Sequence, residues 1–208
     1  MKKYIFPLTL AAVVLTSCGG GNEADVVATD SVEVCTYSYD PTTTTLTWTA
    51  FKLTEKIGVN GTFDEINVIA KEDATDMFAV LTGATFELPI ASLNSQDPVR
   101  DPKIKRSFFG NMTETASITG VVNSISATTA SVSVTMNGVA KEYTGNVSVE
   151  GEKITLTTTI DIVDFGAQTS LDSLSVVCAE KHTGPDGVNK FWTTVHVAVS
   201  TTLIKSCN

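Results

Sequence analysis

Short segments in which apolar and polar residues alternate make up most of the chain after residue 44. Leu46, Trp48 and Ala50, for example, alternate with threonines. Because successive side chains of a β-strand point to opposite faces, this pattern is typical of half-buried strands. Further segments of the same kind are expected at 57–68, 78–89, 116–125, 131–136, 142–149, 153–162 and 193–204. Eight such segments joined by short turns predict an all-β fold, an antiparallel barrel or sandwich.

One segment, residues 171–182, has the period of an amphipathic helix instead. Ser170 occupies the position of an N-cap residue, and Lys181 in the last turn suits the helix dipole. The apolar stripe of this helix consists of Leu171, Leu174, Val177 and Cys178. A single amphipathic helix in a barrel protein has to bury its stripe, and we expect it near one end of the barrel.

The first 34 residues are predicted to lie outside the fold. Lys2 and Lys3 precede an apolar run at 5–15 that is too short to span a membrane, which is typical of a secretory signal. The next residues, ending in Ser17-Cys18, resemble a bacterial lipobox. We therefore expect a lipoprotein signal peptide at 1–17 and acylation of Cys18, which would anchor the chain to a membrane. The alternative is an ordinary signal peptide that contains a cysteine by chance.

Residues 18–34 are small and acidic and have no period, so we expect a flexible tether that leads to one domain at 35–208. The expected location is the cell envelope, with the lipid anchor in the inner or outer membrane and the domain facing the periplasm. Surface display is also open. Removal of the two N-terminal lysines takes the formal charge from −9 to −11. This charge argues against nucleic acid as a partner. A homodimer is left open as a further partner.

The stretch from 86 to 109 carries the most specific motif. An alternating strand leads into Ser92-Leu93-Asn94-Ser95, then Arg100-Asp101, Ile104 and Phe108-Phe109. This spacing resembles the signature of the YceI-like family, with serine at position 95 where the family usually has threonine. Other segments that resemble the same family lie at 48–52, 58–63, 136–142, 161–167 and 182–192. The resemblance covers nearly all of residues 35–207.

Members of that family are lipocalin-like barrels that hold a polyisoprenoid or a fatty-acid derivative. The resemblance therefore implies an antiparallel eight-stranded barrel that binds or carries a long apolar ligand in its lumen. From the residues alone, a packed core explains apolar inward faces at least as well. A filled barrel with a structural or interaction role is thus the alternative. The expected lining residues are Trp48, Phe63, Phe86, Leu88, Phe108, Phe109, Val134, Met136 and Phe165.

The same motif contains two pairs of adjacent residues, Phe108-Phe109 and Arg100-Asp101, for which we expect different roles. Phe108 and Phe109 cannot both face inward on a strand, so we expect one in the lumen and the other beneath the loop. Arg100 and Asp101 are predicted to pin the long loop, because the planar guanidinium can bind several carbonyls or a carboxylate. A contact with a ligand headgroup is the alternative for this pair.

Catalytic residues, metal ligands and cofactors are not expected. The chain has only two histidines, His182 and His196, and it lacks the G-x-S-x-G motif of a serine hydrolase. Cys178 and His182 are spaced to bind a metal or to activate the thiol, but two ligands do not make a metal site. Asp161 and Asp164 are interpreted as strand-end or turn residues, with a general-acid role as the alternative.

The cysteines predict one disulfide. Once Cys18 is acylated, three cysteines remain, and an odd number in an oxidising compartment indicates one bridge and one spare thiol. Cys35 opens the first strand and Cys207 closes the last, so closure of a barrel would bring them together. We therefore predict a Cys35–Cys207 disulfide, with Cys178 buried on the helix.

Overall fold

The structure, a computed structural model, describes residues 33–114 and 116–208. Residues 33–208 form one compact unit. The predicted signal peptide at 1–17, Cys18 and most of the predicted tether lie outside the described residues. No helix within the described ranges is long and apolar enough to cross a membrane.

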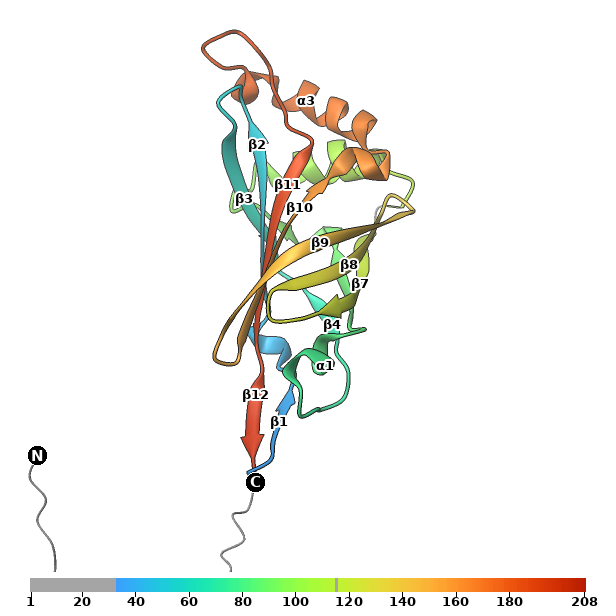
Figure 1. Cartoon of the computed structure of the whole chain (residues 1–208). Helices are drawn as coiled ribbons and strands as arrows, with labels where there is room; N and C mark the ends of the chain where they lie inside the picture. Colours follow the sequence, from blue (N-terminus) through green and yellow to red (C-terminus); the bar gives the residue numbers. More distant parts are fainter. Residues whose placement is uncertain (1–32, 115) are drawn as a thin grey trace, which may run out of the picture. The chain divides into compact units, whose positions relative to one another are not determined.

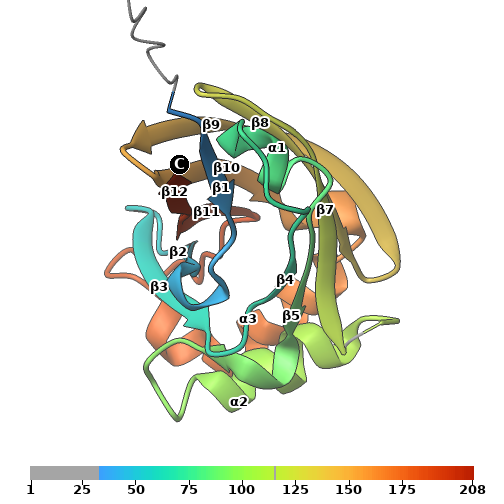
Figure 2. The ribbon, with the colours of Figure 1, turned by 90° about the horizontal axis from the view of Figure 1, so that it is seen from below.

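An antiparallel sheet of ten strands forms most of the unit, in the order β4-β5-β7-β8-β9-β10-β11-β2-β3-β6 (Figures 1 and 2). A separate ribbon joins β1 and β12. The strands are β1 (Cys35–Ser38), β2 (Thr45–Lys52), β3 (Ile57–Phe63), β4 (Asn67–Ile69), β5 (Thr85–Pro89), β6 (Leu93–Asn94), β7 (Ser117–Ile125), β8 (Thr129–Met136), β9 (Val139–Glu150), β10 (Lys153–Asp161), β11 (Thr194–Thr202) and β12 (Ile204–Cys207). The predicted all-β class is confirmed.

The sheet curls into a ring, as Figure 2 shows, and the two short strands β4 and β6 form its edges. Eight longer strands therefore make up the wall, which agrees with the predicted eight. The two edge strands and the two strands of the ribbon were not predicted as separate strands. The chain leaves β5, makes a 3-10 turn at Ile90–Ser92 and pairs as β6 with β3. The segment 85–94 thus connects the strand next to one edge of the sheet, β5, to the strand at the other edge, β6.

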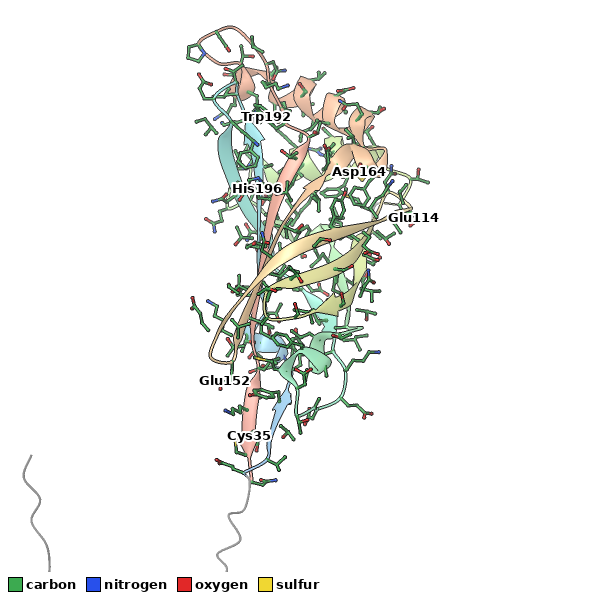
Figure 3. The ribbon with its side chains drawn as sticks, in the orientation of Figure 1. Cys35, Glu114, Glu152, Asp164, Trp192 and His196 are labelled. Carbon is green, nitrogen blue, oxygen red and sulfur yellow. A yellow bond between two sulfur atoms is a disulfide. The ribbon has the colours of Figure 1, made fainter. Side chains whose placement is uncertain are left out.

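The ribbon of β1 and β12 extends the fold beyond one end of the ring (Figure 1). Cys35 and Cys207 are direct partners in its register and form a disulfide, which is the predicted pair. Figure 3 shows Cys35 at this end and Trp192 near the opposite end. Among the described cysteines, Cys178 is the one outside this disulfide, and it is half-buried.

A short helix, α1 (Met77–Leu81), replaces the first part of the strand predicted at 78–89. Asp76 caps it by accepting a hydrogen bond from the Phe78 amide at 3.0 Å. Val80 and Leu81 are buried in a cluster with residues of β8, β9 and β10. A short apolar run fits a strand or a buried helical turn equally well, and here the cap and the packing decide for the helix.

The predicted polar loop before Phe108 is helical in its second half. It contains α2 (Asp101–Lys103), a π-helical turn (Ile104–Phe108) and a 3-10 turn (Phe109–Asn111). Successive residues of a helical turn are about 100° apart rather than 180°, so two neighbouring side chains can both be buried. Phe108 and Phe109 are in fact both buried.

The long helix α3 (Gln168–His182) lies across the other end of the ring, opposite the ribbon (Figure 1). It begins three residues earlier than predicted, with Ala167 at the N-cap position. Ser170 lies inside the helix and is buried, so its predicted role as the cap is wrong. Gly166, directly before Ala167, has φ of +68° and turns the chain from a 3-10 turn (Ile162–Phe165) toward α3.

The predicted apolar stripe of α3 is right in three of its four members. Leu171, Leu174 and Cys178 face the barrel, together with His182 one turn further on. Val177 is 43% exposed. Residues spaced at i, i+3, i+7 and i+11 lie along one side of a helix, whereas Val177 is turned about 100° away from Cys178.

Glycines make room for two aromatic rings on the inner face of the sheet. Trp48 of β2 is paired with Gly61 of β3, and Phe86 of β5 with Gly120 of β7. A Cβ at Gly61 would overlap the Trp48 ring, and one at Gly120 would overlap the Phe86 ring. The Trp48 indole also donates to the Thr62 carbonyl at 3.1 Å. The two rings therefore pack closely against the glycines of the neighbouring strands.

We expect Gly61→Ala to lower the free energy of unfolding by about 1–3 kcal/mol, the usual cost of overpacking a well-packed site. The added methyl group has to displace the Trp48 ring. Urea denaturation monitored by tryptophan fluorescence measures the loss. Gly110→Ala is the matched control, because its Cβ would meet only the Lys105 carbonyl at 3.5 Å. Equal stabilities of Gly61→Ala and wild type would contradict the close packing of Trp48 on β3.

Candidate ligand-binding site

A cavity of about 330 Å³ occupies the inside of the ring. Its lining is almost entirely apolar and comes from the strands of the barrel wall and from α3. Thr44 and Lys52, just before and at the end of β2, both border it, so it follows the strand for about 26 Å at the usual rise per residue. The cavity is therefore an elongated tunnel.

The strand pattern explains the apolar lining. On β11, Val195, Val197 and Val199 face the cavity, and the residues between them face outward. β10 and β8 contribute alternate residues in the same way. The sheet thus has an apolar inner face and an outer face with many threonines, as the period-2 alternation of the sequence predicts.

Eight of the nine predicted lining residues border the cavity: Trp48, Phe63, Phe86, Leu88, Phe108, Phe109, Val134 and Met136. The exception is Phe165. Its side chain is fully buried in the core cluster, 6.0 Å from the Tyr143 ring, and it does not line the cavity. Phe165 belongs to a 3-10 turn after β10, so the strand alternation no longer determines its direction.

Phe108 and Phe109 correct a second expectation. Both rings border the cavity, packed edge to face with centroids 5.0 Å apart. The prediction that only one of them faces the lumen is wrong, because they lie at the end of a π-helical turn and not on a strand. They contribute two neighbouring aromatic surfaces to the wall.

Several residues at the α3 end were not predicted as part of the wall. His182 stacks on Phe191 with ring centroids 4.0 Å apart, and both border the cavity. Trp192 also borders it and donates its indole N–H to the Leu53 carbonyl at 2.9 Å. The Phe191-Trp192 pair directly before the last strand is the one sequence signal that could have indicated them. Helix α3 and the loop after it thus complete this end of the cavity.

Arg100 and Asp101 bind the loop that starts at Ser95. The Arg100 Nε donates to Ser95 Oγ at 2.8 Å and its Nη2 donates to the Ser95 carbonyl. Asp101 accepts from the Ser95 amide at 2.8 Å and from the Ser95 hydroxyl. Ser95 is 2% exposed, so these charged groups satisfy polar atoms that water cannot reach. This geometry agrees with the predicted loop-pinning role, although Arg100 also borders the cavity.

We expect Asp101→Ala to lower the free energy of unfolding by about 2–3 kcal/mol, because it leaves the buried Ser95 amide and hydroxyl without their acceptor. Thermal unfolding followed by circular dichroism measures the change. The control is Asp97→Ala in the same loop. Asp97 accepts from the Val99 and Arg100 amides, and neither donor residue is buried as Ser95 is, so its loss should be clearly smaller. A larger effect at Asp97 would contradict the pinning role of Asp101.

The two aspartates at the end of β10 and in the turn after it have structural roles. Asp161 accepts from the Val163 amide at 3.2 Å at the end of the strand. The Asp164 carboxylate accepts from the Tyr143 hydroxyl at 2.8 Å. Burial, followed by this hydrogen bond, raises the pKa of Tyr143, which therefore remains protonated. Both aspartates serve the turn, in agreement with their interpretation as strand-end residues.

The Cys178 and His182 side chains do not form an activated pair. Burial raises the pKa of the Cys178 thiol, which disfavours the reactive thiolate. Burial, followed by the positive charges of the nearby Lys52 and Arg100, lowers the pKa of His182 to about 4. The His182 Nδ1 is buried without a hydrogen-bond partner in the described part of the chain. These shifts favour the neutral forms of both groups at pH 7.

A curled antiparallel sheet around an apolar tunnel defines a lipocalin-like barrel. The family model of the YceI-like domain matches residues 37–202, so the chain belongs to the YceI-like family. A comparison with curated proteins found no match.

Two solved structures show the same fold. A polyisoprenoid binding domain from Saccharophagus degradans implicated in plant cell wall breakdown is 15% identical, with a TM-score of 0.55 over 84% of this chain and 99% of that chain. BcnA from Burkholderia cenocepacia is 13% identical, with a TM-score of 0.54 over 81% of this chain and 99% of that chain. At such identities the likeness concerns the fold alone.

Proposed function

We propose that this domain binds one long apolar molecule, a polyisoprenoid or a fatty-acid derivative, in its tunnel and carries it without chemical change. The observation that carries the proposal is the apolar cavity of about 330 Å³ that follows the strands of a YceI-like barrel. This volume lies in the range of ligand pockets, about 300–1,000 Å³. Membership of a family with a polyisoprenoid binding domain among its structural neighbours supports the same ligand class.

The alternative is a structural or interaction protein whose barrel is filled by its own side chains. The open volume and its elongated shape favour the carrier. A role without catalysis is supported by the state of the two groups best placed for chemistry, the half-buried Cys178 thiol with its raised pKa and the neutral His182.

We further propose that the mature protein is a lipoprotein of the cell envelope, with acylated Cys18 in the inner or outer membrane and the domain facing the periplasm. The support is the lipobox-like sequence before Cys18 and the acidic tether that follows it. Mass spectrometry of the N-terminal peptide tests this proposal. A peptide that begins at Cys18 and carries acyl chains is expected, whereas an unmodified cysteine or an intact signal peptide contradicts it.

Lipid extraction tests the ligand proposal. The chain from residue 19 onward, which retains the whole compact unit, is purified without detergent, extracted with organic solvent and examined by mass spectrometry. The carrier is expected to release about one long-chain apolar molecule per protein. Native mass spectrometry of the same sample should show the complex. If the protein yields none and binds neither oleate nor farnesol when they are added, the filled-barrel alternative holds.

A further inference from the structure

The two ends of the tunnel differ in charge. At the β1 end the polar lining consists of hydroxyls that bind one another, with Tyr39 OH 2.7 Å from Thr44 Oγ1 and Thr44 Oγ1 3.1 Å from Thr201 Oγ1. At the α3 end the lining includes the cationic side chains of Lys52 and Arg100. The tunnel therefore has an uncharged polar end and a basic end.

The basic side chains leave a positive potential at the inner face of α3. Lys52, Arg100 and Lys103 are all close enough to influence both Cys178 and His182. They help to lower the pKa of His182, and they oppose the rise that burial causes in the pKa of Cys178. Positive charge dominates the surroundings of both groups. An acidic group that entered this end would be attracted.

Of the two cations that line the tunnel, Lys52 is the less balanced by its surroundings. Its Nζ donates to the Lys181 carbonyl at 3.3 Å, a neutral acceptor at the end of α3, and an ammonium group has two further donors. Arg100 is held by Ser95 and has the Asp97 carboxylate nearby. Hydrogen bonds from the backbone amides of Val99 and Arg100, with a smaller effect of the Arg100 charge, lower the pKa of Asp97. Lys52 is thus the residue best able to meet a ligand.

We propose that the α3 end of the tunnel binds the anionic headgroup of a single-chain amphiphile, with Lys52 as its main contact and the chain extended toward the β1 end. This inference rests on the proposed function and adds the class and the direction of the ligand. A half-buried ammonium at the mouth of an apolar tunnel favours an acid over the neutral molecule with the same chain. The carboxylate of a fatty acid and the phosphate of a prenyl phosphate share this chemistry.

Matched pairs of ligands test the proposal on the chain from residue 19 onward. Oleate is compared with oleyl alcohol and farnesyl phosphate with farnesol, by competition with a fluorescent fatty-chain probe at low salt. In at least one pair the acid is expected to bind about tenfold more tightly than the alcohol. Lys52→Met retains an apolar stem but has no charge, so it should remove this preference by weakening the binding of the acid.

Lys56→Met is the matched control. Lys56 lies at the same end, 5.0 Å from the centre of the Trp192 ring and 4.8 Å from that of Phe51, but it does not line the cavity. Its variant should retain the preference for the acid.

The two ligand pairs identify the headgroup. A preference for the acid in the oleate pair assigns a carboxylate headgroup, and a preference in the farnesyl pair assigns a phosphate.

The outcomes separate this inference from the proposed function. If acid and alcohol bind with equal affinity in both pairs, the headgroup proposal is wrong while the carrier function stands. A preference that survives in Lys52→Met but is lost in Lys56→Met also overturns the assignment to Lys52. If none of the four ligands binds, both the headgroup proposal and the carrier function are wrong.

Discussion

Val134→Trp is expected to abolish ligand binding and leave the fold intact. Val134 lies on β8, faces the cavity and is paired across the sheet with Gly120 of β7. An indole ring at this position would extend into the tunnel and occupy space that the ligand needs. Val134 also packs against the core cluster, but because it borders the cavity, part of the added volume can enter the tunnel. We therefore expect the loss of stability to stay within the usual cost of overpacking, about 1–3 kcal/mol.

The measurement is the amount of lipid that co-purifies, together with the affinity for oleate. We expect at least about a tenfold loss of affinity, equivalent to about 1.4 kcal/mol. Val121→Trp is the matched control, because Val121 lies on the neighbouring strand β7 and is 36% exposed. Val134→Ala should bind normally, since it widens the tunnel. A folded Val134→Trp protein with its full load of lipid would show that the ligand lies elsewhere.

The double substitution Cys35→Ser/Cys207→Ser is expected to cause the largest loss of stability. The disulfide joins residues 172 positions apart, and in the chain-entropy model a closed loop of this length contributes about 5 kcal/mol. Apart from the disulfide, the β1–β12 ribbon is a ladder of four residue pairs beyond the end of the barrel. Once the covalent link is lost, its strands should separate easily, because isolated two-stranded ribbons are marginally stable in water.

Thermal unfolding with and without a reducing agent measures this effect. At about 2–4 °C per kcal/mol for a chain of this size, Tm should fall by about 10 °C or more. The reducing agent should lower the Tm of the wild type and not that of the double variant. Cys178→Ser is the control and should change Tm little, since Cys178 lies outside the disulfide. Peptide mapping under non-reducing conditions that found Cys178 in the bridge would contradict the assignment.

The two predictions are independent because they concern different parts of the domain. Val134 lies on β8 and borders the tunnel, whereas the disulfide lies at the outer end of the ribbon (Figure 3). The disulfide variant should therefore still bind lipid below its Tm. Loss of binding in the folded disulfide variant would indicate that the ribbon helps to hold the ligand.

The long strands were predictable because their signal is local. Alternation with a period of two is present within each segment, so the barrel wall and its inward residues, such as Trp48 and Leu88, could be identified one segment at a time. The Cys35–Cys207 pair was predicted from the closure of a barrel, whereas the structure brings these cysteines together in the separate β1–β12 ribbon. The YceI-like motif around Arg100-Asp101 indicated the family.

The failures occurred where the backbone leaves the strand conformation. The segment 77–81 is short and apolar and fits a strand or a helix, and only the Asp76 cap and the packing of Val80 decide between them. Phe108 and Phe109 both face the tunnel, and Phe165 does not, because each lies in a helical turn where alternation no longer applies. None of these directions can be obtained from a pattern of period two.

The amino-acid sequence alone determined the all-β class, the membership of the family and the cysteines that join the ends of the domain. Only the tertiary structure decided that the barrel is hollow, because an apolar inner face fits a filled core and an open tunnel equally well. The difference depends on how far the curled sheet holds opposite walls apart and on how α3 covers one end. It also depends on cross-strand contacts, such as the Trp48 ring on Gly61, that keep large side chains against the wall. Lys52 and Arg100 come to lie at one mouth of that tunnel for the same reason, since segments far apart in the sequence meet there.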